Sequence, residues 1–383
     1  MMIEIRNAGF VNKGAELMLH AILEMMKKKY PNAKFVMAPN LMNQKYEDRI
    51  KLGFYQKPYY WKKRIQWARI ADFIPKDIRT MYGIILDKEI DVVLDASGFT
   101  YSDQWNAGGA YELSVSTNKW KENRTKVILL PQALGPFKSK KIQNYMTNAI
   151  ENIDLVFARE RISYEHITNA VGKRKNIKQF PDFTNLIAGV IPQDFDSIKN
   201  NFCIIPNYRM IDKVSEKESK AYLPFLIKCI KYLLKTNQKP FLLVHDTEKD
   251  FLLAKEIQET IDEHIEIIIE KNPLKIKGII GVCEGTIGSR FHGLVSALSQ
   301  GIPSLATGWS HKYQMLFDDY NFSDGLVNIT VTDAELYSKI DLIINQASKQ
   351  KIKKALQEKS LLLKEESRKM WNEVFKIIDE EST

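Results

Sequence analysis

The chain has 383 residues, which is more than one hydrophobic core usually organises, so two domains are expected. Its apolar fraction of 44% and charged fraction of 27% are those of an ordinary globular protein and exclude global disorder. The net charge of +9 favours an anionic partner, such as phosphate, a nucleic acid or an acidic membrane surface.

The predicted elements alternate between short strands and helices along the chain. In the first half, strands are expected at 2–6, 34–38, 91–95, 126–131 and 155–158. In the second half, strands are expected at 201–206, 240–245, 265–269, 278–282 and 303–306. Helices are expected at 15–30, 139–152, 221–236, 249–264 and, as one long charged helix, 349–378. Continuous apolar strands separated by helices predict parallel sheets that helices cover on both faces.

The alternation lapses at residues 181–201, which contain two prolines, and we place the domain boundary there. The sequence thus predicts an α/β protein with two doubly wound parallel-sheet (Rossmann-like) domains facing a cleft. These are an N-terminal domain at 1–190 and a C-terminal domain at 200–348, followed by the long helix at 349–383. Ligands of such sheets bind outside the carboxyl ends of the strands.

The cysteines and the N-terminus bear on location. Cys203, Cys229 and Cys283 fit neither a disulfide framework nor a zinc site, which indicates a reducing compartment. The N-terminus lacks the apolar core of a signal peptide, and no apolar run approaches the ~20 residues that span a bilayer. We therefore expect a cytoplasmic protein that can contact the cytoplasmic face of the inner membrane.

The segment 54–79 combines cations with aromatic residues. It holds seven basic residues against two acidic ones, and Tyr59, Tyr60, Trp61 and Trp67 are interleaved with them. This composition suits an acidic membrane interface, and it equally suits an acceptor that carries a diphosphate-linked lipid. A third interpretation is an insertion that packs on the N-terminal domain and presents a solvated basic face.

The stretch GTIGSRFHGLVSALSQGIPSLATGW at 285–309 places Arg290 and His292 at or just before the start of an apolar helix. A helix N-terminus attracts anions through its unpaired N–H groups and its dipole. A guanidinium adds a planar fork that suits phosphate or carboxylate. The alternative is structural: Arg290 pairs with a carboxylate, and His292 caps the helix.

This stretch resembles the C-terminal motif of the polysaccharide pyruvyltransferase family, an Arg-x-His signature followed by a helix and Gly-x-Pro. The similarity continues over most of the chain, through GFVNKGAELML at 9–19, DASGF at 95–99, LLPQALGPF at 129–137, VFARERIS at 156–163 and FPDFT at 180–184. The first of these departs from the usual pattern, because Ala15 stands where the family often has an aspartate.

The resemblance implies a GT-B-like fold and transfer of the enolpyruvyl unit of phosphoenolpyruvate to two sugar hydroxyls, forming a cyclic ketal. It implies that Arg290 and His292 are the donor-binding pair, with the backbone of Phe291 close to the donor. Arg159 corresponds to a further donor-binding arginine from the other domain. The N-terminal domain is then the acceptor side. The acceptor is a sugar of a cell-surface or capsular polysaccharide, or of its lipid-linked precursor.

The chemistry suits these residues. Phosphoenolpyruvate must be protonated on its methylene carbon, and a histidine, with a reference pKa near ~6.5, is a suitable acid. We therefore assign catalysis to His292, and donor contacts also to Ser289 and Lys312. Acceptor contacts are predicted for residues at or after strand ends and in the first strand-to-helix loop: Asn12, Lys13, Asp95, Ser97, Gln132 and His245. An Asx-turn at Asp95 and a surface turn at His245 are the structural alternatives. We expect no metal and no cofactor.

Two other function classes stay open. A nucleotide-sugar glycosyltransferase of the same architecture would also have a glycine loop, a helix and Gly-x-Pro. Many such enzymes carry a carboxylate on that helix for the ribose, whereas residues 293–300 contain none. A non-enzymatic polyanion binder is permitted by the net charge. Its basic residues are spread along the chain, however, and no nucleic-acid-binding module is recognisable, so we expect no nucleic-acid partner.

Overall fold

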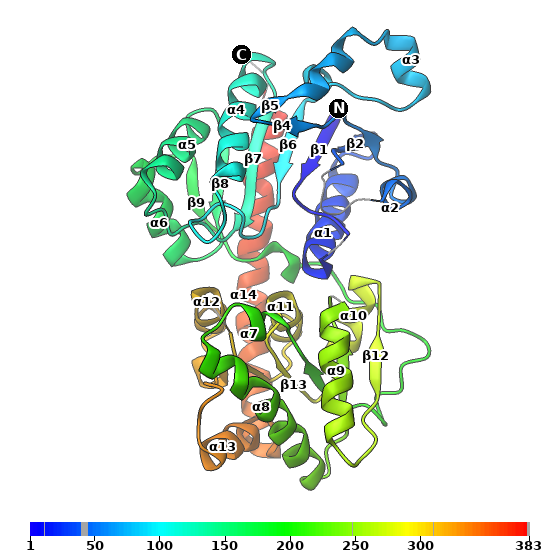
Figure 1. The fold of residues 1–383 in the computed structure, drawn as a ribbon, viewed down its shortest axis with the longest axis vertical. Helices are drawn as coiled ribbons and strands as arrows, with labels where there is room; N and C mark the ends of the chain where they lie inside the picture. The colour runs from blue at the N-terminus through cyan, green and yellow to red at the C-terminus, as the bar shows by residue number, and fades with distance from the viewer. Residues whose placement is uncertain (11, 40–44, 247, 309, 381–383) are drawn as a thin grey trace. The chain divides into compact units, whose positions relative to one another are not determined.

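The computed structural model describes residues 1–10, 12–39, 45–246, 248–308 and 310–380 (Figure 1). The chain divides into two compact units, each with its own parallel sheet. The first unit contains residues 1–11, 18–183 and 366–383, and the second contains 12–17 and 184–365. Within the described ranges, no helix combines the length and the apolarity needed to cross a membrane.

The first unit is built on a seven-stranded sheet in the order β3-β2-β1-β6-β7-β8-β9, and every neighbouring pair is parallel. Its strands are β1 (Met2–Arg6), β2 (Lys34–Met37), β3 (Tyr55–Gln56), β6 (Val92–Asp95), β7 (Lys126–Gln132), β8 (Leu155–Ala158) and β9 (Ile177–Gln179). The strand order reverses between β1 and β6, which is where doubly wound sheets bind ligands.

Helices and a small hairpin complete this unit. The longer helices are α1 (Lys13–Lys29, whose first turn belongs to the second unit), α4 (Gly108–Glu122), α5 (Lys140–Ile150) and α6 (Arg161–Val171). The shorter elements are α2 (Tyr46–Lys51), β4 (Trp61–Lys62), β5 (Ile65–Gln66), η1 (Trp67–Phe73), α3 (Lys76–Met81) and η2 (Asp87–Glu89). The chain passes into the second unit within η3 (Phe183–Asn185). Buried apolar residues of β6, β7 and β8 form the core together with α4, α5 and α6.

The second unit has a five-stranded parallel sheet in the order β12-β11-β10-β13-β14. Its strands are β10 (Phe202–Ile205), β11 (Pro240–Val244), β12 (Ile267–Ile269), β13 (Gly285–Gly288) and β14 (Ser304–Ala306). All residues of β10, β11, β13 and β14 are buried, as expected for a sheet covered on both faces. The order reverses between β10 and β13, so the carboxyl end of β13 is the expected ligand position.

The helices of the second unit begin at recognisable caps. Ser215 and Glu218 form a capping box at the start of α8, and Asn272 caps α10 ahead of Pro273. The helices are α7 (Arg209–Asp212), α8 (Glu216–Lys235), α9 (Glu248–Thr260), α10 (Pro273–Gly281), α11 (Phe291–Leu298), α12 (His311–Asp319), η4 (Ser323–Gly325), α13 (Asp333–Ile344) and the first part of α14 (Gln346–Asp379).

One predicted strand is wrong. Residues 278–282 belong to the end of helix α10 and to its C-cap, and the strand that follows is β13. Gly285 of β13 lies against the ring of Phe202, where a Cβ would come within 2.5 Å of a ring carbon. The packing therefore requires glycine at this position, although glycine is uncommon inside strands and hides β13 from a prediction based on composition.

The long helix α14 runs without a break through residues of both units. Its last part packs in the first unit, where the buried ring of Trp371 meets Phe183 edge-on at 5.9 Å. Its first part belongs to the second unit, where Ser360 donates a hydrogen bond to the carbonyl of Ser299 at 2.7 Å.

Candidate active site

Arg290 lies in the turn between β13 and α11 of the second unit, and His292 lies in the first turn of α11. Arg290 is the N-cap residue of α11, with extended backbone angles, and His292 is the second residue of the helix. The first N–H groups of a helix have no acceptor within it, so this turn directs positive potential outward. The alternative that His292 caps the helix is therefore wrong, because Arg290 holds the cap position.

Two carboxylates hold the guanidinium of Arg290. Its Nη1 lies 2.7 Å from Oδ2 of Asp246, and its Nη2 lies 2.6 Å from Oδ1 of Asp250. Asp250 is fully buried and also accepts a hydrogen bond from the backbone N–H of Tyr208. Burial alone would lower the pKa of Arg290, but Asp250 and Asp246 outweigh it and raise that pKa. The guanidinium is thus a permanent cation in a fixed place, and the alternative that Arg290 pairs with a carboxylate is confirmed.

The first turn of α1 belongs to the second unit, and the residues at its start contact Asp246, one of the two carboxylates that hold Arg290. Asn12 accepts hydrogen bonds from the backbone N–H groups of Gly14 and Ala15 at 2.9 and 3.1 Å and so caps α1. Its side-chain amide donates to Asp246 at 3.3 Å, and the backbone N–H of Lys13 donates to Asp246 at 3.2 Å. The structure therefore brings Asn12 and Lys13, both predicted to bind the acceptor, next to the partner of Arg290.

Gly14 sets the position of the catalytic candidate. A Cβ built on Gly14 would lie 2.2 Å from Nδ1 of His292 and 2.8 Å from its Cγ. The imidazole therefore packs directly on the backbone of Gly14, in space that any other residue would fill. The half-buried ring also packs edge-on against Phe291, with centroids 5.4 Å apart.

His245 directly follows β11 and is buried in the same cluster. Burial lowers its pKa well below 6.5, and the neighbouring basic side chains of Arg290, His292 and Lys13 lower that pKa further. His245 is therefore a neutral imidazole near neutral pH. The surface turn considered as its alternative is wrong, because the side chain is 5% exposed.

Ser289 anchors the turn before Arg290. Its carbonyl accepts hydrogen bonds from the side-chain amide of Asn207 at 2.5 Å and the hydroxyl of Tyr313 at 2.8 Å. Its hydroxyl lies 2.9 Å from that of Tyr222, and the whole residue is buried. These bonds fix the path of the chain into α11, and the predicted donor contact of Ser289 stays a prediction.

Lys312 adds positive charge beside the start of α11. Its Nζ lies 5.5 Å from the centroid of the Phe291 ring and 5.6 Å from that of Tyr313. The ring of Phe291 meets Tyr313 edge-on at 6.0 Å, so the two aromatic side chains support the lysine. The predicted donor residues of the second unit are thus grouped around one helix terminus.

In the first unit, three predicted acceptor residues meet at the ends of adjacent strands. Asp95 ends β6 and Gln132 ends β7, and the hydroxyl of Ser97 donates to the side-chain carbonyl of Gln132. Asp95 accepts hydrogen bonds from Asn7 at 2.8 Å and Tyr101 at 2.9 Å. It also accepts one from the backbone N–H of Ser97 at 3.2 Å, which is the Asx-turn that the sequence left as an alternative.

Comparison with known proteins shows the family. The sequence model described as polysaccharide pyruvyl transferase matches residues 12–311. This range includes Asp95, Gln132 and His245 at the ends of their strands and the start of α11. The chain belongs to the polysaccharide pyruvyl transferase family. Its membership makes the protein a transferase and confirms the family inferred from the motifs. No match was found among curated protein sequences.

Solved structures confirm the predicted GT-B-like α/β fold of this member of the family. HepE of Anabaena, in complex with UDP-glucose, is 11% identical with a TM-score of 0.57, over 97% of this chain and 99% of that one. The UDP-GlcNAc 2-epimerase of Neisseria meningitidis, bound to UDP-GlcNAc, is 9% identical with a TM-score of 0.58, over 98% and 100%. The UDP-GlcNAc 2-epimerase of Methanocaldococcus jannaschii is 10% identical with a TM-score of 0.57, over 90% and 93%.

The remaining donor candidate of the transferase, Arg159, lies in the first unit. It follows β8, is 4% exposed, and its Nη1 lies 3.3 Å from Oδ2 of Asp182. Its backbone N–H donates to the carbonyl of Gln132 at 3.0 Å. The FPDFT motif thus supplies the carboxylate that holds the arginine of the VFARERIS motif.

Sequence reasoning missed two parts of the transferase site. Asp250 was not singled out, although it stands four residues after Asp246, in the helix that follows β11. That spacing, which puts two carboxylates on one side of a helix start, was the available signal. Gly14 was quoted only as part of a motif, and nothing in the sequence indicates that it lies against His292.

Proposed function

We propose that this protein transfers the pyruvyl group of phosphoenolpyruvate to two hydroxyls of a sugar, forming a ketal and releasing phosphate. The acceptor is a sugar of a cell-surface or capsular polysaccharide, or of its lipid-linked precursor. The reaction takes place in the cytoplasm, in agreement with three buried cysteines that are all free. The observation that carries the proposal is a fixed arginine and a histidine together at the N-terminus of α11, within the matched family range.

The donor combines a phosphate and a carboxylate and therefore needs several positive groups. Arg290, the amide end of α11 and Lys312 supply them on one side of the helix start. Among the described residues, the buried Nε–H of Arg290 has no hydrogen-bond acceptor. Asp246 and Asp250 fix the guanidinium in advance, and the donor then binds without first ordering it.

His292 is the proposed general acid. It gives a proton to the methylene carbon of phosphoenolpyruvate, which leaves an oxocarbenium-like centre at the adjacent carbon. The first sugar hydroxyl attacks that carbon, and its proton returns to His292. The C–O bond to phosphate then breaks, and the second hydroxyl closes the ketal while its proton leaves with the phosphate. A positioned acid of this kind contributes ~10² to 10⁴ in rate.

The acceptor is assigned to residues at the carboxyl ends of the strands, which is where doubly wound sheets bind ligands. The proposed residues are Asn12, Lys13, Asp95, Ser97, Gln132 and His245. His245 serves as a neutral hydrogen-bonding group, because its pKa is held well below 6.5. Arg159 remains the proposed donor contact from the first unit, held in place by Asp182.

The second candidate is a nucleotide-sugar glycosyltransferase. The solved structure of HepE contains UDP-glucose, and its fold is similar to that of this chain. Helix α11 reads FHGLVSAL and carries no carboxylate to hold a ribose. This composition supports a small, highly charged donor over a nucleotide.

Thermal stabilisation by ligand distinguishes the two candidates. Phosphoenolpyruvate is expected to stabilise the wild type by about 2.7 kcal/mol at a hundredfold excess over Kd, and UDP-sugars are expected to have no effect. The stabilisation should disappear in Arg290→Ala and weaken in Arg290→Lys, which keeps the charge without the fork. Arg209→Ala removes an exposed arginine of the same unit and should leave the response unchanged. Stabilisation by UDP-sugars alone would refute the proposed donor.

A further inference from the structure

Residues 60–82 of the first unit expose an unusual amount of apolar surface. Among the described residues, eight of the exposed large apolar side chains fall within this short range: Tyr60, Ile65, Trp67, Ile70, Phe73, Ile78, Met81 and Tyr82. Phe73 is 86% exposed and Met81 is 80% exposed. Contiguous exposed apolar residues usually mark a site of interaction.

The exposed residues are ordered into two stripes. In the 3-10 helix η1, Trp67, Ile70 and Phe73 are spaced by three residues, so their side chains lie above one another. At α3, Ile78, Met81 and its C-cap Tyr82 follow at spacings of three and four, which places them on one face of an α-helical turn. Both patterns are those of amphipathic segments, but here the apolar sides are turned to solvent instead of the core.

Cations occupy the tip of the neighbouring hairpin. Strands β4 and β5 pair Lys62 with Ile65, which leaves Lys63 and Arg64 as the two turn residues. Both have positive φ angles, 49° and 65°, where this type of turn normally has Asn-Gly. Two basic side chains are therefore kept at strained positions, and such strain commonly marks a functional segment.

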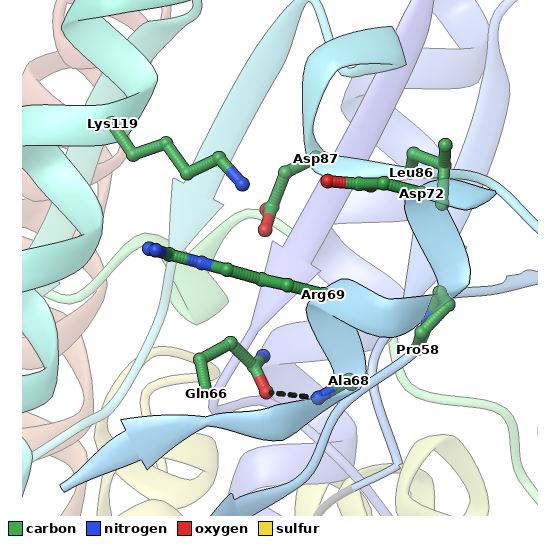
Figure 2. Close-up of a pocket in the computed structure, with 8 residues that line it drawn as sticks. All are labelled: Pro58, Gln66, Ala68, Arg69, Asp72, Leu86, Asp87 and Lys119. Carbon is green, nitrogen blue, oxygen red and sulfur yellow. Dashed lines mark hydrogen bonds between the residues drawn. The ribbon is translucent and has the colours of Figure 1, made fainter.

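The hairpin and η1 are held together as one surface. The side-chain carbonyl of Gln66 accepts hydrogen bonds from the backbone N–H of Tyr60 at 3.1 Å and of Ala68 at 3.2 Å. Figure 2 shows Arg69 extending from η1 along a polar pocket that Asp87 and Lys119 also line. The apolar stripe of η1 therefore stays exposed to solvent beside this pocket.

We propose that residues 60–82 dock on an anionic lipid bilayer. Lys62, Lys63 and Arg64 lie at the level of the lipid phosphates, and the two apolar stripes enter the interface between headgroups and acyl chains. The exposed charge complements such a surface, since Arg69 and Lys76 bring the exposed cations of residues 60–82 to five and only Asp72 and Asp77 oppose them. Trp67 and Tyr82 are residue types that favour the membrane interface.

A second copy of this chain is the other occupant that an apolar patch could receive. Self-association through this patch would bring two positively charged hairpin tips close together, which is unfavourable. A bilayer with anionic lipids offers opposite charge and an apolar layer at the same time. The charge therefore decides between the two partners.

Co-sedimentation of the full-length protein with lipid vesicles tests the proposal. We expect binding to vesicles of equal parts phosphatidylglycerol and phosphatidylcholine, weakening as salt increases, and little binding to phosphatidylcholine alone. The triple variant Lys62→Gln, Lys63→Gln, Arg64→Gln should bind the anionic vesicles on the order of 100-fold more weakly, from roughly fivefold for each cation. Phe73→Ser with Met81→Ser should also lose binding.

Matched variants on α14 separate these effects from general charge and hydrophobicity. Lys351, Lys353 and Lys354 are exposed, and their change to Gln removes the same charge. Leu361→Ser with Leu362→Ser removes a similar exposed apolar pair. Both controls should bind vesicles like the wild type, and thermal melting should show that all variants are folded.

Three outcomes would overturn the proposal. These are equal binding to neutral and anionic vesicles, equal losses in the α14 controls, and an absence of vesicle binding. Sedimentation velocity adds a check, because self-association that Phe73→Ser abolishes, without vesicle binding, would make this surface a dimer interface. The assay contains neither donor nor acceptor, so its failure leaves the proposed transfer reaction unaffected.

Discussion

Replacing Gly14 with alanine tests whether the contact with His292 sets the position of the imidazole. The new Cβ would lie 2.2 Å from Nδ1, whereas ordinary contact begins at 3.4 Å, so the ring must retreat by more than 1 Å. A displacement of that size at a reacting group costs on the order of 10²-fold in rate. We therefore expect Gly14→Ala to reduce phosphate release from phosphoenolpyruvate about 100-fold.

Stability separates this contact from a general effect of the substitution. Alanine in α1 gains up to ~1 kcal/mol of helix propensity, while the overpacking costs ~1–3 kcal/mol. In wild type the clash should dominate, and urea denaturation should show a net loss of stability. In a His292→Ala background the clash is gone, so the same substitution should become neutral or stabilising. An equal effect of Gly14→Ala in both backgrounds would refute the contact.

Two further predictions concern buried ionisable side chains. The pKa of His245 is depressed in the folded state, so the unfolded state takes up a proton first as the pH falls through about 6.5. The free energy of unfolding should therefore decrease below that pH by up to ~1.4 kcal/mol per pH unit. His245→Gln should flatten this slope in urea denaturation, and an unchanged slope would contradict the neutral state assigned to His245. Lys57 lies 2.6 Å from both Glu4 and Asp87, so Lys57→Met should cost ~3–5 kcal/mol near neutral pH, and less in acid where the carboxylates protonate. The exposed Lys88→Met is its control, and equal losses in thermal melting would exclude a special role for the buried pair.

The centre of the candidate site could be predicted from the sequence, because the local pattern of apolar residues marks the start of helix α11. Arg290 and His292 stand where an apolar run changes from strand to helix, and the structure places them at that helix start. The partners of Arg290 could not be found in this way. Asp246 and Asp250 precede it by 44 and 40 residues, and only the order of the sheet, in which β11 and β13 flank β10, brings them together.

The wrong strand has a physical reason as well. Gly278 to Val282 reads as a short β-type run, but Asn272 and Pro273 are a cap and a first-turn proline that start a helix earlier. The true strand, β13, contains Gly285 and Gly288 in four residues, because Phe202 and Ile205 occupy the space of their side chains. Tertiary packing thus overrode the local preference in both places.

The course of α14 has a consequence for how the protein is made. Residues 366–383 complete the first unit, where Trp371 is almost fully buried, yet the whole of 184–365 is translated before them. The ribosome therefore completes the second unit before it makes the last segment of the first. Until then, the apolar surface that this segment covers in the first unit stays exposed. Ending the chain after residue 365 should accordingly damage the unit that is translated first.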